Sequence, residues 1–201
     1  MIEVYKKGKS LQDNRKMSRI KGYPKIFLTK KDRQVTIRLP KKDDLDELLR
    51  YINELVDEDT TIMMNEKVSK KEEKEYLEGV LKAIRNKEGF SLLAFYKGKL
   101  VANVSVERRK YRQSHLGSLG ISVRKDFRDE GLGTELIRQA IVLSKDFLKL
   151  KLLVLNVFAV NKKAIYLYER MGFKKCGKWP KGVLYQGKYI DDTLMYLNLG
   201  I

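Results

Sequence analysis

The 201-residue sequence has little of several residue types on which common protein chemistries depend. It contains one cysteine, Cys176, and one histidine, His115. A single cysteine excludes an intrachain disulfide and a cysteine-rich zinc site, and a single histidine excludes a site built from several imidazoles. No stretch reaches the roughly 18 uncharged apolar residues of a membrane-spanning helix, and the first residues lack the apolar core of a signal peptide. We therefore expect a cytoplasmic protein that binds neither metal nor membrane.

Negative charge is scarce relative to positive charge. The chain carries 43 Lys and Arg against 26 Asp and Glu, a formal net charge of +17, and the first 34 residues hold 11 of the basic and 3 of the acidic side chains. Such an excess attracts polyanions, including nucleic acid and the ribosome. The excess therefore has two possible explanations: association with the ribosome or nucleic acid, or a proteome that is generally rich in lysine.

Hydrophobic periodicity divides the chain into a basic N-terminal extension, residues 1–34, and one domain, residues 35–201. The domain is predicted to be mixed α/β with the element order β-α-α-β-β-β-α-β-α-β-β. The run Leu152–Phe158 is nearly all apolar, as expected of a strand buried on both faces. The predicted strands are 35–39, 90–96, 99–106, 116–123, 152–158, 173–178 and 189–197; the helices are 45–55, 69–84, 132–147 and 162–170; residues 180–188 are a loop.

The most informative segment joins the strand that ends at Val123 to the helix that begins near Gly131. Two glycines, Gly131 and Gly133, are separated by one residue and let the main chain approach a ligand closely. The first N–H groups of a helix have no partner within the helix and point together at an anion. The segment therefore indicates a main-chain pyrophosphate site, to which Arg128 could add a charge. A turn followed by an ordinary helix start is the structural alternative.

Two motifs, in order, resemble those of one enzyme family. Arg128-x-x-Gly131-x-Gly133 resembles the acetyl-CoA signature Gln/Arg-x-x-Gly-x-Gly/Ala of the GNAT superfamily of N-acetyltransferases. About 28 residues further on, residues 161–173 resemble the family's second block, Asn-x-x-Ala-x-x-Leu-Tyr-Glu-x-x-Gly-Phe. The resemblance is specific over residues 119–173 and includes ribosomal-protein alanine and amino-acid N-acetyltransferases.

This resemblance implies a GNAT-like fold and acetyl-CoA as cosubstrate. The expected sheet is twisted, mostly antiparallel, flanked by helices and splayed where acetyl-CoA binds. Backbone amides of the strand that ends at Val123 would bind the pantetheine arm and polarise the thioester carbonyl, as an oxyanion hole does. The implied cofactor-binding residues are Ile121, Ser122, Val123, Arg128, Asp129, Glu130, Gly131, Leu132, Gly133, Thr134 and Asn161.

Tyr168 matches the tyrosine with which family members protonate the departing thiolate, so it is the predicted catalytic residue. A phenol of pKa about 10 stays protonated at neutral pH, and a thiol of pKa about 8.5 is a moderate leaving group. The alternative is a helix aromatic that packs its ring in the core. Tyr166, two residues away, lies on another side of the helix and is the poorer candidate.

No general base is evident in the sequence. The related ribosomal-protein alanine N-acetyltransferases carry a catalytic glutamate five residues before the motif asparagine, and this chain has Asn156 there, whose amide cannot act as a base. Glu107, His115, Asp192 and ordered water are the alternatives, and each of the three side chains could equally have an ordinary surface or turn role.

The acceptor is predicted to be a primary amine. Neutralising a lysine-like amine of pKa about 10.4 costs about 4.6 kcal/mol at pH 7, whereas an α-amine of pKa about 7.8 costs about 1 kcal/mol. Without an evident base, the α-amino group of a protein N-terminus or small amino compound is favoured. Residues 57–68 and 179–188 are expected to wall the acceptor pocket, and the side chains of Met63 and Met64 either line it or pack in the core.

Two other functions stay open at this point. A basic module could bind RNA or the ribosome through the extension and Arg108–Arg112, although the sequence has no RNA-binding motif. A CoA-binding sensor without turnover is the other alternative, and the presence of Tyr168 argues against it. The sequence leaves open whether the protein forms a homodimer.

Overall fold

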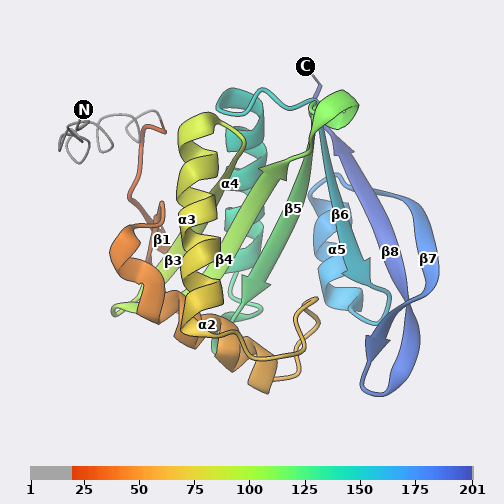
Figure 1. The fold of residues 1–201 in the computed structure, drawn as a ribbon, viewed down its shortest axis with the longest axis horizontal. Coiled ribbons are helices and arrows are strands. Elements are labelled where there is room, and N and C mark those ends of the chain that lie inside the picture. Colours follow the sequence, from red (N-terminus) through yellow and green to blue (C-terminus); the bar gives the residue numbers. More distant parts are fainter. Residues whose placement is uncertain (1–19, 201) are drawn as a thin grey trace, which may run out of the picture.

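The computed structural model describes residues 20–200 and is built around one eight-stranded sheet (Figure 1). The strand order is β1-β2-β3-β4-β5-β6-β8-β7, and each neighbouring pair is antiparallel except the parallel pair β5–β6. The strands are β1 (Lys25–Leu28), β2 (Gln34–Arg38), β3 (Gly89–Tyr96), β4 (Lys99–Arg108), β5 (Leu116–Val123), β6 (Leu152–Phe158), β7 (Lys174–Tyr185) and β8 (Lys188–Asn198). The α-helices are α2 (Leu45–Asp57), α3 (Lys70–Asn86), α4 (Leu132–Asp146) and α5 (Lys162–Arg170).

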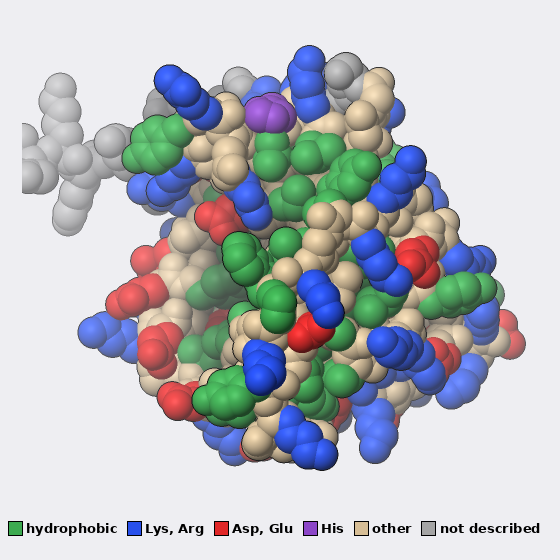
Figure 2. All heavy atoms as spheres, turned by 90° about the vertical axis from the view of Figure 1, so that its right-hand side faces the viewer, with side chains coloured by type: hydrophobic (Ala, Val, Ile, Leu, Met, Phe, Trp, Pro, Cys, Tyr) green, Lys and Arg blue, Asp and Glu red, His purple; other side chains and the backbone are tan. Residues whose placement is uncertain are grey.

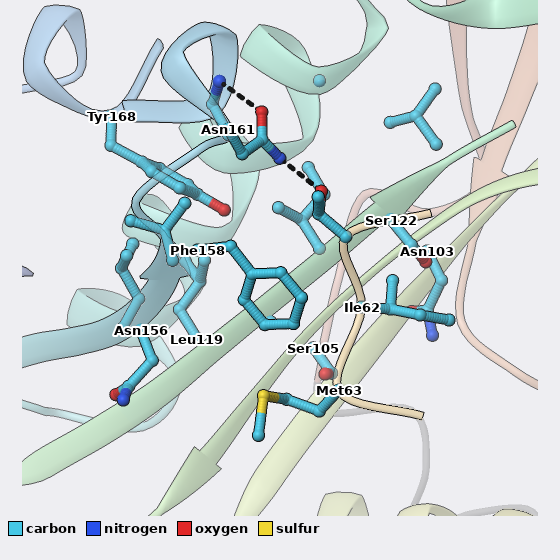
Figure 3. A pocket seen from close by; sticks show the side chains of 18 of the residues that line it. Ile62, Met63, Asn103, Ser105, Leu119, Ser122, Asn156, Phe158, Asn161 and Tyr168 are labelled. Carbon is cyan, nitrogen blue, oxygen red and sulfur yellow. Dashed lines mark hydrogen bonds between the residues drawn. The ribbon is translucent and has the colours of Figure 1, made fainter. Parts of the chain in front are cut away.

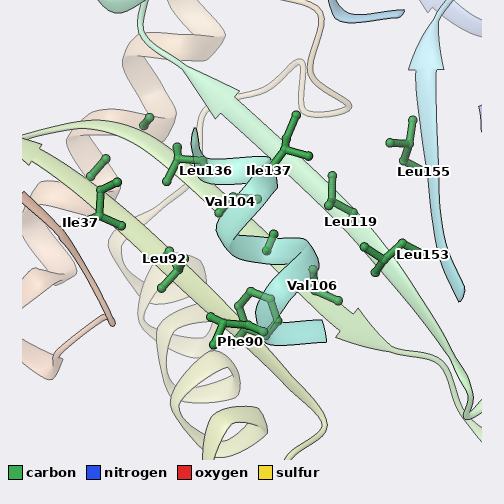
Figure 4. Packing of buried hydrophobic residues seen from close by; sticks show 14 of the residues in the cluster. Ile37, Phe90, Leu92, Val104, Val106, Leu119, Leu136, Ile137, Leu153 and Leu155 are labelled. Carbon is green, nitrogen blue, oxygen red and sulfur yellow. The ribbon is translucent and has the colours of Figure 1, made fainter. Parts of the chain in front are cut away.

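Strands β3 and β4 separate two hydrophobic cores because successive side chains of a strand point to opposite faces. Leu92 and Val104 pack in the larger core with α4, and Leu93 and Leu100 pack in the smaller core with α2 and α3. Figure 4 shows Leu92 and Val104 on the α4 side of the sheet. The middle of the sheet is therefore buried on both faces, which gives the cavity described below a rigid frame.

Helix α4 is amphipathic, and its buried face fixes its position across the sheet. Leu132, Leu136, Ile137 and Ala140 recur at helical spacing and are fully buried (Figure 4). Burying a leucine or isoleucine side chain stabilises a fold by about 1.5–3 kcal/mol. Leu132 is the first residue of the helix, so the N-terminus of α4 is anchored in the core directly beside the end of β5.

The parallel pair β5–β6 is short, and this opens the sheet. Only three residue pairs join the two strands, from Leu116–Leu152 to Ser118–Val154, after which the strands diverge (Figure 1). Beyond that point β5 stays paired with β4 as far as Val123, and β6 stays paired with β8. The facing edges of β5 and β6 therefore have no partner strand within the described part of the chain.

The predicted element order is confirmed from β2 onward, with three differences. Lys25–Leu28, inside the predicted extension, form β1 and pair with β2; residues 1–19 of that extension lie outside the described residues. The predicted loop 180–188 is wrong over residues 180–185, because β7 resumes its pairing with β8 at Val183 after an irregularity. Strand β6 is not buried on both faces, because the face that carries Asn156 lines the opening.

Replacing Gly117 by alanine is expected to lower the free energy of unfolding by about 1–3 kcal/mol through overpacking. A Cβ atom on Gly117 would lie 2.5 Å from Leu150 Cδ1 and 2.8 Å from Val106 Cγ1, both buried where β5 and β6 are still paired. Urea denaturation measures the change. Gly120→Ala in the same strand is the matched control, because the nearest atom to its Cβ would be Ser105 Oγ at 3.6 Å. Equal losses in the two variants would contradict this packing argument.

Candidate active site

A cavity of about 590 Å³ occupies the opening between β5 and β6 (Figure 3). Its walls come from the ends of both strands, the first turn of α4, α5 and the loop that follows α2. Residues on both faces of the sheet border it, Gly133 on the α4 side and Ser105 on the opposite face. An elongated ligand could therefore pass between the strands.

The N-terminus of α4 lies at one end of this cavity. Gly131 precedes the helix with a left-handed φ of +86°, and no side chain caps the first turn. Two other helices differ: Ser69 caps α3 by accepting a hydrogen bond from the Glu72 N–H, and Asn161 caps α5 by accepting one from the Ala164 N–H, whereas α2 also begins without a side-chain cap. The uncapped N–H groups of α4 fit a pyrophosphate.

A second glycine keeps this end of the cavity close to α5. A Cβ atom on Gly133 would lie 3.4 Å from Leu167 Cδ2 and 4.0 Å from Val123 Cγ2. A larger side chain there would therefore fill the space between the start of α4 and α5. The two glycines act differently: one permits the backbone turn and the other keeps the space open.

Most polar side chains predicted to bind the cofactor have other partners. Arg128 donates to the Val123 carbonyl at 2.9 Å and to Glu58 at 2.7 Å, which ties the segment after β5 to the end of α2. The Ser122 hydroxyl lies 2.8 Å from the Tyr51 hydroxyl, and burial raises the pKa of that phenol above its usual range. These side chains shape the site, so any contact of this segment with a ligand would come chiefly from its main chain.

The other residues predicted to bind the cofactor also fall into two groups: those whose side chains have partners or lie elsewhere, and those that line the cavity. The Glu130 side chain is buried and ion-paired with Arg33, and Leu132 lies in the core. Asp129 is exposed and paired with Lys163, whose ammonium group holds the pKa of the carboxyl below its usual range. Thr134 is exposed. Ile121, Val123 and Gly133 line the cavity, as does Asn161, whose side-chain amide also donates to Thr61 Oγ1 at 2.6 Å.

Tyr168 lies on the wall of the cavity opposite β5. Its ring packs edge-on against Phe173 with centroids 5.7 Å apart, and only 6% of the residue is exposed. Figure 3 shows its hydroxyl directed toward the middle of the pocket. Burial raises the pKa of this phenol to about 12, so the group holds its proton at every pH at which an amine is nucleophilic. By contrast, the neighbouring Tyr166 is 62% exposed on the outer side of α5.

The three candidate bases lie in different surroundings. Glu107 and His115 are exposed near the closed end of the β5–β6 pair. Asp192, on β8, is 4% exposed and accepts a hydrogen bond from the Asn156 amide at 2.5 Å, and its Oδ1 atom has no hydrogen-bond partner among the described residues. Asn156 itself lines the cavity, so of the three carboxylate and imidazole groups Asp192 is linked most directly to it.

Of the two segments expected to wall an acceptor pocket, residues 57–68 contribute residues 60–63 to the lining of this cavity, and residues 179–188 contribute none. Met63 borders the cavity and is exposed at its mouth, but Met64 is not part of the lining. The β7–β8 turn instead touches the loop after α2, where the Tyr185 hydroxyl donates to the Asp59 carbonyl at 3.1 Å. Both methionines are partly exposed, so neither packs in the core.

Arg109 is a cavity residue that the sequence analysis treated only as part of a basic loop. It is half-buried, donates to Ser118 Oγ at 3.2 Å and to Gln113 Oε1 at 3.3 Å, and has no carboxylate partner within the described chain. The signal for its position was present, since Asn103, Ser105 and Arg109 lie at even spacings along β4 and its extension and therefore share one face. The face of the cavity that Asn103 and Ser105 border thus carries a positive charge.

Residues 20–200 contain no helix long and apolar enough to cross a membrane and no cluster of His, Cys, Asp and Glu suited to a metal ion. On the β7–β8 side, Figure 2 shows lysine and arginine side chains spread among apolar ones rather than gathered in one patch. Binding to the ribosome or nucleic acid stays a prediction.

Comparison with known proteins places these features in a family. The sequence model of the acetyltransferase (GNAT) family matches residues 49–173. Over 105 residues the chain is 30% identical to the L-amino acid N-acetyltransferase AaaT of Escherichia coli, covering 52% of this chain and 65% of that protein, just under two thirds of its length. The structure is similar to that of a GNAT-family acetyltransferase from Streptococcus pneumoniae, with a TM-score of 0.74, 27% identity and coverage of 82% and 99% of the two chains.

A structure from Salmonella typhimurium with its cofactor acetyl-CoA has a TM-score of 0.73 at 20% identity, over 83% of this chain and 95% of that one. The chain therefore belongs to the GNAT acetyltransferase family. The predicted fold class and N-acetyltransferase family are confirmed, and acetyl-CoA as cosubstrate agrees with that family.

Stability at high pH is expected to depend on Tyr168. Because the folded-state pKa is about 12 and that of an unfolded tyrosine is about 10, the folded protein keeps this proton while the unfolded chain loses it. The contribution is fully present below pH 10 and is lost as the pH rises toward 12, by about 2 kcal/mol. Tyr168→Phe should therefore show a shallower fall of the unfolding free energy over this window in denaturant titrations.

Tyr166→Phe is the matched control on the same helix and should keep the wild-type slope. Other buried tyrosines, such as Tyr23, are common to all three proteins and cancel in the comparison. A Tyr168→Phe variant with the wild-type slope would show that this phenol is not held in its protonated form.

Proposed function

We propose that this protein is an N-acetyltransferase that transfers the acetyl group of acetyl-CoA to a primary amine, with the α-amino group of a small amino acid favoured. The observation that carries the proposal is the buried Tyr168 hydroxyl, which points into the gap opposite the unpaired edge of β5 (Figure 3). A proton donor and main-chain N–H donors thus face each other across one cavity.

Acetyl-CoA would supply an activated acetyl thioester at this point. The uncapped N–H groups of α4 would bind its pyrophosphate, and N–H groups of residues 121–123 would bind the pantetheine arm and the thioester carbonyl oxygen. As the amine nitrogen forms its bond to the carbonyl carbon and the carbon–sulfur bond breaks, Tyr168 would give its proton to the sulfur, and the proton that the nitrogen loses would pass to the phenolate, directly or through water. Burial disfavours a phenolate as well as a thiolate, so the proton from the nitrogen would have to return to Tyr168 as the sulfur is protonated, leaving no anion in the cavity.

Three arguments support an amino acid as the acceptor. An α-amine costs about 3.5 kcal/mol less to neutralise at pH 7 than a lysine-like amine, so it needs less help from a base. Arg109 offers the acceptor side a guanidinium that no described carboxylate neutralises, and Arg binds carboxylates in a two-pronged geometry. A polyamine would bring further positive charge toward that group. The similarity to an L-amino acid N-acetyltransferase points the same way.

Turnover should be tested as thiol release from acetyl-CoA across amino acids, N-terminal peptides, lysine peptides and polyamines. We expect turnover on α-amines and a fall of about 10²-fold in kcat for Tyr168→Phe, with CoA affinity unchanged by calorimetry. Gly131→Glu should lose CoA binding, because it strains the left-handed backbone and adds a negative charge at the anion site. Tyr166→Phe is the control with wild-type kinetics. Turnover on polyamines and lysine side chains alone would remove the α-amine proposal.

The role of Arg109 can be isolated with paired acceptors. Arg109→Gln should raise KM about tenfold or more for an L-amino acid, because a charge-assisted contact to the carboxylate is worth about 1.5–3 kcal/mol. The KM for the corresponding amino acid amide, which lacks the carboxylate, should change little. Steady-state kinetics with both acceptors measures the difference. An equal rise for acid and amide would show that Arg109 acts on the fold rather than on the acceptor.

A further inference from the structure

We propose that the hairpin of β1 and β2, which precedes the segment matched by the family model, is a working part of the acetyl-CoA site. In this proposal Arg33 is a positioning residue that holds residues 126–131 in their anion-binding conformation, and Lys30 adds a cation beside that segment. The inference rests on the proposed use of acetyl-CoA and extends the site to residues outside 49–173.

The first observation is a buried ion pair between the hairpin and residues 126–131. Glu130 is 1% exposed and receives two hydrogen bonds from Arg33, one of them from Nε to Oε2 at 3.0 Å, and its Oε1 lies 3.2 Å from Lys31 Nζ. Arg33 also donates to the Asp126 carbonyl. A buried carboxylate that loses its partner is strongly destabilised, so this pair fixes where the segment lies.

The orientation of the Arg33 guanidinium is itself fixed by packing. Its central carbon lies 3.8 Å from the centroid of the Phe127 ring, and Phe127 packs edge-on against Tyr96 of β3. A guanidinium stacked on an aromatic ring gains a favourable cation–π contact while its N–H groups stay free to donate in the plane. Arg33 therefore contacts the segment at three places, which are the Asp126 carbonyl, the Phe127 ring and the Glu130 carboxylate.

The second observation is direct contact between the hairpin and the glycine that begins α4. The Lys30 N–H donates to the Glu130 carbonyl at 3.1 Å. A Cβ atom on Gly131 would lie 3.7 Å from Phe27 Cζ and 3.9 Å from Lys30 Cε. Lys30 has no ion-pair partner within residues 20–200. The Lys30 side chain thus lies beside the start of the helix, where its charge also acts on the Asp129 carboxylate.

These contacts bear on ligand binding because the segment they hold is strained. Asp129 has φ of +63° and Gly131 has φ of +86°, so two left-handed residues flank Glu130. A left-handed non-glycine residue such as Asp129 is unfavourable on its own and persists only where its surroundings impose it. Successive N–H groups in such a conformation form a concave anion site. Releasing Glu130 would let the backbone relax and would turn these N–H groups away from a pyrophosphate.

The test compares CoA binding, measured by calorimetry, with kcat/KM for two donors, acetyl-CoA and S-acetylpantetheine. S-acetylpantetheine carries the same thioester and lacks every phosphate. Arg33→Met should weaken CoA binding tenfold or more and lower kcat/KM for acetyl-CoA by a similar factor, while kcat/KM for S-acetylpantetheine stays within about twofold. Arg33→Lys should restore part of the affinity. Lys30→Met, at an exposed site, should weaken CoA binding at least threefold.

The matched control is Arg38→Met at the other end of β2. Arg38 forms a similarly buried ion pair with Asp44, with N···O 2.6 Å, far along the strand from residues 126–131. This variant should lower the melting temperature and leave the affinity for CoA unchanged.

Two results would overturn the inference. One is wild-type CoA affinity in both Arg33→Met and Lys30→Met; the other is an equal loss with S-acetylpantetheine and acetyl-CoA, which would mark a purely structural role. A wild-type protein that binds no CoA would instead overturn the proposed function together with this inference.

Discussion

The structure depends on the early end of hydrogen bonding between β5 and β6. Backbone N–H and C=O groups need partners, and the edge of a strand that loses its neighbour presents a row of them. Here three parallel residue pairs hold the strands together, and Gly117 lets buried leucine and valine side chains close that end tightly. Beyond it, the two strands keep their outer neighbours, so the sheet stays intact while its middle opens. The cavity, the position of Tyr168 and the exposed edge of β5 all follow from this divergence.

Side chains around the cavity hold the main chain in place more than they face the cavity. Arg128, Ser122, Glu130 and Asn161 each bind another part of the protein, from α2, the hairpin of β1 and β2, and the loop after α2. What they leave free is main chain: the edge of β5 and the first turn of α4. Under the proposed function, the donor would be recognised chiefly by peptide groups whose orientation is set by these polar contacts. The acceptor would instead meet side chains, because Arg109, Asn156 and Tyr168 line the cavity.

The sequence predicted the elements that carry strong local patterns and missed those that depend on distant partners. β6 was located to the residue because its apolar run is nearly continuous. β5 and α5 were located equally well because they adjoin or form the two motifs that resemble those of the family. β1 has four mostly exposed residues, and nothing local shows that it packs beside Gly131. The second half of β7 is exposed at nearly every position, so no alternation marked it as a strand. The motif positions singled out residues 128–134 for a pyrophosphate site. They did not distinguish residues whose main chain faces the cavity from residues such as Glu130, whose side chain binds another part of the protein.

Residues on both faces of the sheet border the cavity, and this has a consequence for how two ligands could reach it. Gly133 and the start of α4 border it on one face, and Ser105 and the loop after α2 border it on the other. A donor arriving from the first face and an acceptor arriving from the second would meet within the thickness of one sheet, where neither blocks the other's route. Under the proposed function, acetyl-CoA and the acceptor could therefore be bound at the same time. CoA could leave along the route by which acetyl-CoA entered, and the acetylated amine along the route by which the acceptor entered.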